Sequence, residues 1–166
     1  ALLIAITKLF QDRGFEYLNW KEYCPELFSN KNNLTNREPS KEANLNLSKA
    51  LNIFKNYGNL DIGQSLIVQN EIVLGLEAAE GTDQLIIRCA DLKTNGDKGV
   101  LIKASKYNQS NILDIPTIGT KTLELLIEND YEGVFIEKQN CLIIDKDDTI
   151  NLANSKNLFI STFEKI

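Results

Sequence analysis

Apolar residues at the start of the chain recur with helical spacing. Within residues 1–14 they occupy positions 2, 3, 6, 9 and 10, which share one face of a helix, and Gly14 is a natural end for it. The run 15–20 that follows predicts a short strand. The chain lacks methionine and begins inside an apolar pattern, so we expect its natural N-terminus to lie upstream.

A polar segment, 29–42, separates this first part from the rest. Leu34 is its one large apolar residue, so we predict a loop that is mobile or weakly packed. A helix is then expected to open at Ser40 and to run to about Tyr57. The apolar face of that helix holds Leu47, Ala50, Leu51 and Phe54.

Beyond residue 63 short apolar runs alternate with helical patterns. Residues 64–69 and 72–77 predict two strands joined by a tight turn at Asn70 and Glu71. The pattern next predicts a helix from Thr82 or Asp83 through Asp91, a turn at Asn95-Gly96 and a buried strand over 99–104. A helix is expected after Gly119-Thr120, with Leu123, Leu126 and Ile127 on its apolar face. A second strand pair over 133–137 and 141–145, a helix capped by Asp147 or Asp148 and a final apolar run over 158–160 complete the predicted elements.

Strands interleaved with helices indicate an α/β fold. The two apparent hairpins make the expected sheet mixed, with helices flanking it. A chain of 166 residues is long enough to bury one good core.

Composition excludes several kinds of chemistry. The chain has no histidine, so it cannot build a Ser-His-Asp or Cys-His nucleophile system. Its three cysteines are far apart in sequence, which argues against a zinc site and fits a reducing cytoplasm. A net charge of -5 argues against binding nucleic acid through a basic face.

Four short polar signatures stand where an apolar run meets a turn. Loops at strand ends are where α/β proteins place polar chemistry. Three of the signatures supply carboxylates and one supplies two lysines, a combination that suits a divalent cation and a phosphate. They are Asp61-Ile62-Gly63-Gln64, Glu80-Gly81-Thr82-Asp83, Lys103-Ala104-Ser105-Lys106 and Asp114-Ile115-Pro116-Thr117-Ile118-Gly119.

Each signature also has a purely structural interpretation. Asp61 and Gly63 are ordinary turn residues, and Thr82 or Asp83 is a good helix cap. The functional alternative for residues 80–83 is a helix N-terminus that offers free N–H groups to a phosphate. Lys103 is either solvated, as single lysines usually are, or acts with Lys106 to clamp a diphosphate.

A rigid aspartate is the strongest candidate for metal binding or general base catalysis. Pro116 fixes the backbone after Asp114, which then points back toward the preceding loop. Alone, Asp114 would be a turn residue. The acidic run at Asp145, Asp147 and Asp148 lacks the glycine and distal glutamate of an EF-hand, which favours capping.

Taken together in this order, the motifs resemble the C-terminal part of the metal-dependent UDP-2,3-diacylglucosamine pyrophosphatases of the DUF1009 type. The similar stretches are Asp61 to Gln64, Leu76 to Asp83 with Arg88, Val100 to Gly119, Gly133 to Glu137 and Cys141 to Asp145. The resemblance implies that residues 1–42 are the end of an upstream linker or N-terminal domain. Residues 43–166 would then form a C-terminal catalytic-type domain.

The resemblance also implies a reaction and a set of residues. The family hydrolyses the pyrophosphate of UDP-2,3-diacylglucosamine to UMP and 2,3-diacylglucosamine 1-phosphate in lipid A biosynthesis, with Mg²⁺. Motif matching assigns Asp114 and Asp83 as catalytic residues and, with Glu80, as metal ligands, so Asp83 and Asp114 are expected to reach one cation. It assigns Gln64, Thr82, Lys103, Lys106 and Gln109 to substrate binding.

Three positions depart from the family pattern, where Tyr107, Ser110 and Ile112 replace Pro, Asp and Arg. They keep a rival hypothesis open, a non-catalytic and degenerate module that binds a nucleotide sugar or a lipid. For the enzyme we expect a cytoplasmic location, a UDP-diacylglucosamine-type lipid substrate and no nucleic acid. The resemblance leaves open a peripheral contact with the inner membrane and a homo-oligomeric state.

Overall fold

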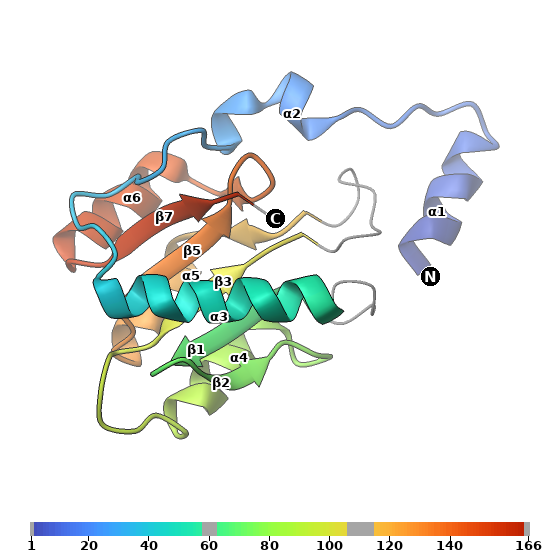
Figure 1. Ribbon diagram of the computed structural model, residues 1–166. Coiled ribbons are helices and arrows are strands. Elements are labelled where there is room, and N and C mark those ends of the chain that lie inside the picture. Colours follow the sequence, from blue (N-terminus) through green and yellow to red (C-terminus); the bar gives the residue numbers. More distant parts are fainter. Residues whose placement is uncertain (1, 58–62, 106–114, 165–166) are drawn as a thin grey trace.

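The computed structural model describes residues 2–57, 63–105 and 115–164, in which helices and strands alternate (Figure 1). The first half holds α1 (Leu2–Gln11), α2 (Trp20–Tyr23), a 3₁₀ turn η1 (Pro25–Leu27), α3 (Lys41–Tyr57), β1 (Ser65–Gln69), β2 (Ile72–Leu76) and α4 (Gly81–Ala90). The second half holds β3 (Val100–Lys103), β4 (Thr117–Ile118), α5 (Thr120–Glu128), β5 (Gly133–Glu137), β6 (Leu142–Ile143), α6 (Lys146–Ser155) and β7 (Phe159–Phe163).

Five strands form one mixed sheet in the order β2-β1-β3-β5-β7. β1 is antiparallel to both β2 and β3, whereas β3, β5 and β7 are parallel to one another. The predicted α/β fold with a mixed sheet and flanking helices is therefore confirmed. A small second sheet pairs β4 with β6 in parallel.

The first predicted hairpin is confirmed. β1 and β2 are joined at Asn70 and Glu71, whose φ angles are 52° and 58°. Two consecutive positive φ angles are those of the hairpin turn that matches the twist of its strands.

The second predicted strand pair is wrong. β5 lies between β3 and β7, while β6 turns away and pairs with β4. Every residue of β5 is buried. Both sides of β5 are taken by its parallel neighbours β3 and β7, which leaves no free side for a hairpin with β6.

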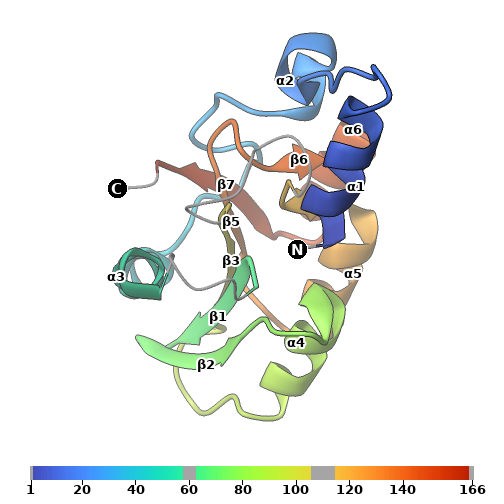
Figure 2. The same cartoon turned by 90° about the vertical axis from the view of Figure 1, so that its right-hand side faces the viewer.

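Helices cover both faces of the sheet. Figure 2 shows α3 on one side and α4, α5 and α6 on the other. One core cluster lies beneath α3 and includes Ala50, Phe54, Leu66, Ile102, Phe135 and Phe159. The other lies beneath α4, α5 and α6 and includes Leu85, Ile86, Cys89, Leu101, Leu123, Leu126, Val134 and Ile160. The predicted apolar faces of α3 and α5 are thus confirmed.

Helix capping follows the prediction at α3 only. The hydroxyl of Ser40 accepts the N–H of Ala43 at 3.0 Å, which is the bond of a helix N-cap. At α4 the cap position is Glu80, and its side chain makes no cap bond. The predicted cap residue Thr82 lies inside the helix, and its hydroxyl donates to Glu77 instead. At α6 the cap position is Asp145, and its side chain makes no cap bond either.

Segment 29–42 is not weakly packed, contrary to the prediction. It runs beside β7, where the N–H of Leu34 donates to the carbonyl of Ile160 at 2.9 Å. The N–H of Thr162 donates in turn to the carbonyl of Asn32 at 2.8 Å. Because β7 is an edge strand, its free backbone groups offer partners to a polar segment that has little apolar surface to bury.

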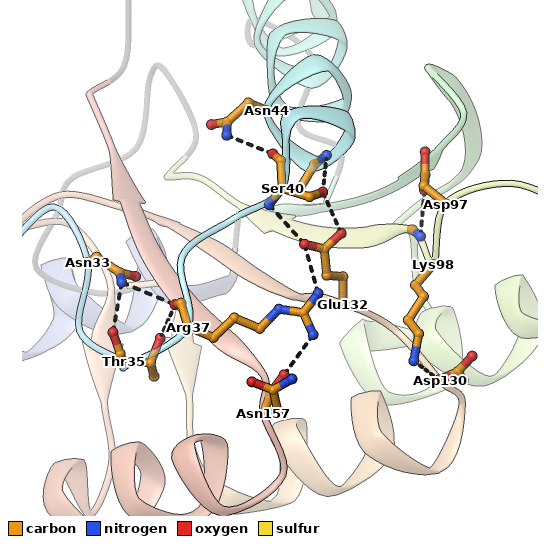
Figure 3. Close-up of polar contacts among 12 residues, drawn as sticks. Asn33, Thr35, Arg37, Ser40, Asn44, Asp97, Lys98, Asp130, Glu132 and Asn157 are labelled. Atoms are coloured by element: carbon orange, nitrogen blue, oxygen red, sulfur yellow. Dashed lines mark hydrogen bonds and ion pairs between the residues drawn. The ribbon is translucent and has the colours of Figure 1, made fainter.

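A buried glutamate fastens the end of this segment (Figure 3). Glu132 is 4% exposed and accepts the N–H of Ser40 at 2.9 Å and its hydroxyl at 2.8 Å. The guanidinium of Arg37 lies 3.2 Å from the same carboxylate and also donates to the carbonyl of Asn157 at 2.8 Å. The start of α3 is thereby tied to the amino end of β5.

The expected strand at 15–20 is absent, since residues 15–19 are irregular and α2 begins at Trp20. Phe15 and Leu18 are 60% and 57% exposed, so these apolar residues do not enter the core. Figure 1 shows α1 set apart from the sheet. None of the helices in the described part of the chain is long and apolar enough to cross a membrane.

We predict that Gly133→Ala lowers the free energy of unfolding by about 1–3 kcal/mol, the usual cost of overpacking a core. A methyl group at this position would collide with the carbonyl oxygen of Phe159 and come within 2.6 Å of its ring. Urea unfolding followed by circular dichroism measures the change.

Gly119→Ala is the matched control. Its new methyl group would meet Ile144 at 3.4 Å, which is ordinary contact, so we expect only the smaller loss caused by alanine at the N-cap of α5. Equal unfolding midpoints for the two variants would contradict the close approach of β5 to β7.

Candidate functional site

Polar side chains converge at the edge of the sheet where β3 and β5 end. What we call the polar edge is formed by the side chains of Ser65, Glu77, Thr82 and Lys103 together with the backbone carbonyl of Thr117. They come from β1, the end of β2, the first turn of α4, β3 and β4. Ligands of α/β proteins bind outside the carboxyl ends of the strands, which is where this edge lies.

Lys103 is the centre of the polar edge. It is the last residue of β3 and only 6% exposed. Its ammonium donates to the hydroxyl of Thr82 and to the carbonyl of Thr117, both at 2.9 Å. Both partners are neutral, and within the described part of the chain one N–H of the ammonium is left for a ligand. The carboxylate of Glu77 reaches this ammonium only through the hydroxyl of Thr82, and a buried cation without a directly bonded anion favours a bound anion.

Glu77 joins three of the predicted substrate-binding residues. Its carboxylate accepts the hydroxyl of Thr82 at 3.0 Å and the backbone N–H of Gln64 at 3.0 Å. Through Thr82 it reaches Lys103. The structure thus brings Gln64, Thr82 and Lys103 together, as the motifs predicted. The sequence reasoning gave Glu77 no role, although it belongs to the quoted motif at a strand end.

Gly63 lies so close to Glu77 that no side chain would fit at position 63. The N–H of Gly63 donates to the carbonyl of Glu77 at 3.0 Å. A methyl group on Gly63 would collide with that carbonyl and come within 2.6 Å of the Glu77 side chain. The glycine of the Asp-Ile-Gly-Gln signature is therefore needed for close packing against β2.

Asp83 lies in the first turn of α4, next to Thr82, and is paired with an exposed lysine. Its carboxylate is 2.6 Å from the ammonium of Lys121, and this neighbour raises the pKa of Lys121. Surface pairs of this kind are worth little, so Asp83 can exchange this lysine for another cation at small cost.

Glu80 is more firmly engaged than Asp83. One of its oxygens accepts two N–H groups of Arg88, at 2.7 and 3.0 Å, and this contact lowers the pKa of Glu80. The other oxygen accepts the N–H of Ala78 at 3.1 Å. Glu80 would have to leave Arg88 to serve as a metal ligand.

Among the residues that the structure describes, no cluster of three or more acidic, cysteine or histidine side chains could hold a metal ion. Asp114, Lys106 and Gln109 lie outside these residues, and so does the expected sharing of one cation by Asp83 and Asp114. Mg²⁺ is commonly held by one or two carboxylates together with substrate phosphates. Asp83 fits one such position.

A second buried carboxylate stands at the end of β5. Glu137 is 4% exposed and accepts the N–H and the hydroxyl of Ser105, both at 2.7 Å. The side-chain amide of Asn140 donates to its other oxygen at 2.6 Å. The motifs gave no signal for this contact, because Ser105 and Glu137 are 32 positions apart in sequence.

The nearby thiol of Cys141 is not a nucleophile. It is 1% exposed, and burial raises its pKa to about 12. Nucleophilic cysteines need a thiolate at neutral pH, which this environment opposes.

We predict that Lys103→Met weakens the binding of inorganic pyrophosphate by roughly 10–100-fold, the range for a lost hydrogen bond to a charged group. The methionine keeps the apolar stem and removes the charge. Isothermal titration calorimetry on the folded variant measures the affinity.

Lys98→Met is the control, since Lys98 pairs with Asp130 at 2.6 Å near the amino end of β3 (Figure 3). The Lys98→Met variant also removes one lysine charge, but at a position outside the polar edge. If both variants bound pyrophosphate equally, Lys103 would not be part of an anion site.

Comparison with known proteins identifies the family. Residues 30–161, which include all the polar-edge residues, match the model of the LpxI C-terminal domain. The chain is also similar to the UDP-2,3-diacylglucosamine pyrophosphatase LpxI of Caulobacter vibrioides, with 33% identity over 166 residues. That alignment covers 96% of this chain and 59% of the relative, so the chain spans less than two thirds of the relative's length. The resemblance predicted from the motifs is confirmed, and the chain belongs to the LpxI C-terminal domain family.

Proposed function

We propose that the polar edge holds the pyrophosphate of UDP-2,3-diacylglucosamine while it is hydrolysed to UMP and 2,3-diacylglucosamine 1-phosphate. The observation that carries this proposal is the buried ammonium of Lys103, whose described partners are neutral. The family and the reaction named for the Caulobacter relative support the substrate.

The chain's own groups supply positive potential to the diphosphate. The ammonium of Lys103 has one N–H to offer a non-bridging oxygen. The first N–H groups of α4 have no partner within the helix and add to that potential. In the reaction, water adds to one phosphorus and the bond to the bridging oxygen breaks. Donors fixed in advance at the edge stabilise the charge that develops on these oxygens.

Two aspartates complete the proposed site. Asp83 and Asp114 are the residues that would hold Mg²⁺, together with phosphate oxygens of the substrate. Bound Mg²⁺ neutralises the diphosphate and lowers the pKa of a coordinated water. Asp114 is proposed to orient the attacking water as general base. Lys106 and Gln109 follow β3 in sequence and are proposed to contact the same diphosphate.

The proposed substrate also suggests where the protein acts. Its three cysteines are free, which suits a reducing cytoplasm. A diacylated substrate resides in a membrane, so we propose a peripheral contact with the inner membrane during turnover.

The test measures UMP release from UDP-2,3-diacylglucosamine with added Mg²⁺, using the protein encoded by the complete gene. We expect turnover by the wild-type protein and a loss of about 10²–10⁴-fold in Asp114→Asn, the scale of a general acid–base group. Asparagine is an equally good turn former, so the fold should persist.

Asp130→Asn is the control, because Asp130 is an exposed aspartate paired with Lys98, away from the polar edge. It should leave turnover unchanged. Binding of the substrate by the wild-type protein without UMP release would instead favour the rival hypothesis, a non-catalytic nucleotide-sugar or lipid-binding module.

A further inference from the structure

Two buried glutamates stand at opposite ends of β5. Glu132 directly precedes the strand and Glu137 is its last residue. Both are 4% exposed, and both accept the backbone N–H and the hydroxyl of one serine. Five residues of extended chain separate them by about 16 Å. The same kind of contact therefore occurs once at the polar edge and once away from it.

Both carboxylate oxygens of Glu137 accept hydrogen bonds. One oxygen accepts both groups of Ser105 at 2.7 Å, and the other accepts the amide of Asn140 at 2.6 Å. The orientation of Asn140 is itself fixed, because its oxygen accepts a hydrogen bond from the ammonium of Lys21. The carboxylate thus meets donors on both sides.

Ser105 stands at the exit of β3. It is two residues after Lys103, and Lys106 follows it directly in the chain. The intervening residue is held as well, since the N–H of Ala104 donates to the carbonyl of Gln64 at 2.9 Å. Fixing the backbone at Ser105 therefore fixes the exit of β3 directly after Lys103.

We infer that Glu137 is a positioning residue for phosphate binding at the polar edge. Its carboxylate holds the backbone at Ser105 and so keeps the end of β3, which carries Lys103, in place at the polar edge. This inference rests on the proposed function for its substrate. It goes beyond that function by assigning a role to a group that does not itself touch the phosphate.

The negative charge of Glu137 is needed for this role, and not only its shape. A glutamine here has one oxygen and one NH₂ group. If its oxygen faces Ser105, its NH₂ group meets the NH₂ group of Asn140. If the glutamine amide is flipped, its NH₂ group faces the backbone N–H of Ser105. Either arrangement leaves two donors facing each other in a buried place, so the serine contact is lost or displaced.

The test compares Glu137→Gln with Glu132→Gln in the protein encoded by the complete gene. Both variants remove one buried charge that binds one serine, and Glu132→Gln also removes the ion pair with Arg37, so its loss of thermal midpoint should be at least as large. Glu132 lies at the other end of β5, in contact with Ser40 and Arg37 (Figure 3). The Glu132→Gln variant therefore shows how a loss of stability alone affects pyrophosphate binding and turnover.

We expect Glu137→Gln to weaken the binding of inorganic pyrophosphate, measured by calorimetry well below both thermal midpoints. We also expect kcat at saturating UDP-2,3-diacylglucosamine to fall, and hydrogen exchange to rise at residues 103–105. The loss in kcat should be about 10–100-fold, as for other residues that orient ligand-binding groups. Glu132→Gln should keep both constants within about 2-fold of wild type, with exchange raised at residues 40–43 instead.

Equal pyrophosphate affinities in the two variants would overturn the positioning role and leave Glu137 as a structural residue. Failure of the proposed function would be seen separately, as absence of UMP release by the wild-type protein. In that case weaker pyrophosphate binding by Glu137→Gln alone would still support the inference, because the affinity measurement does not depend on turnover.

Discussion

The parallel pairing of β3 with β5 is the constraint on which the site depends. Its register joins Val100 to Gly133 at one end and Lys103 to Ile136 at the other. Two parallel strands end at the same edge, so Lys103 and Glu137 arrive there together. The helix α4 and the turn after β2 then add Thr82 and Glu77 to the same edge. An antiparallel arrangement would place these polar residues at opposite ends of the sheet.

The positive and negative side chains at the polar edge have different hydrogen-bond partners. Lys103 is buried with neutral oxygens around it and is left to attract an anion. Glu77 and Glu137 accept hydrogen bonds from hydroxyl, amide and backbone donors, and among the described residues neither contacts the lysine directly. A buried charge is tolerated when hydrogen bonds satisfy it, as they do for the two glutamates, whereas the ammonium of Lys103 keeps one N–H for a ligand.

Local sequence signals predicted most of the fold. The hairpin at Asn70 and Glu71 and the cap at Ser40 depend on neighbours a few residues away, so the pattern revealed them. The apparent hairpin at 133–145 was misinterpreted because strand pairing depends on distant residues. The packing of segment 29–42 on β7 was missed for the same reason, since its partners lie more than a hundred positions later.

The site was predicted in part. Turn chemistry and motif order marked Gln64, Thr82 and Lys103, which lie together in the structure, whereas the contacts of Glu77 and Glu137 are not visible in a single sequence. The role of Gln64, Thr82 and Lys103 in substrate binding stays a prediction. The assignments of Asp114, Lys106 and Gln109 stay predictions. The most direct test is a crystal structure of the protein with UDP-2,3-diacylglucosamine bound and Mg²⁺ replaced by Ca²⁺ to slow hydrolysis. The account predicts a diphosphate oxygen within hydrogen-bond distance of the Lys103 ammonium, and a diphosphate bound away from the ends of β3 and β5 would contradict it.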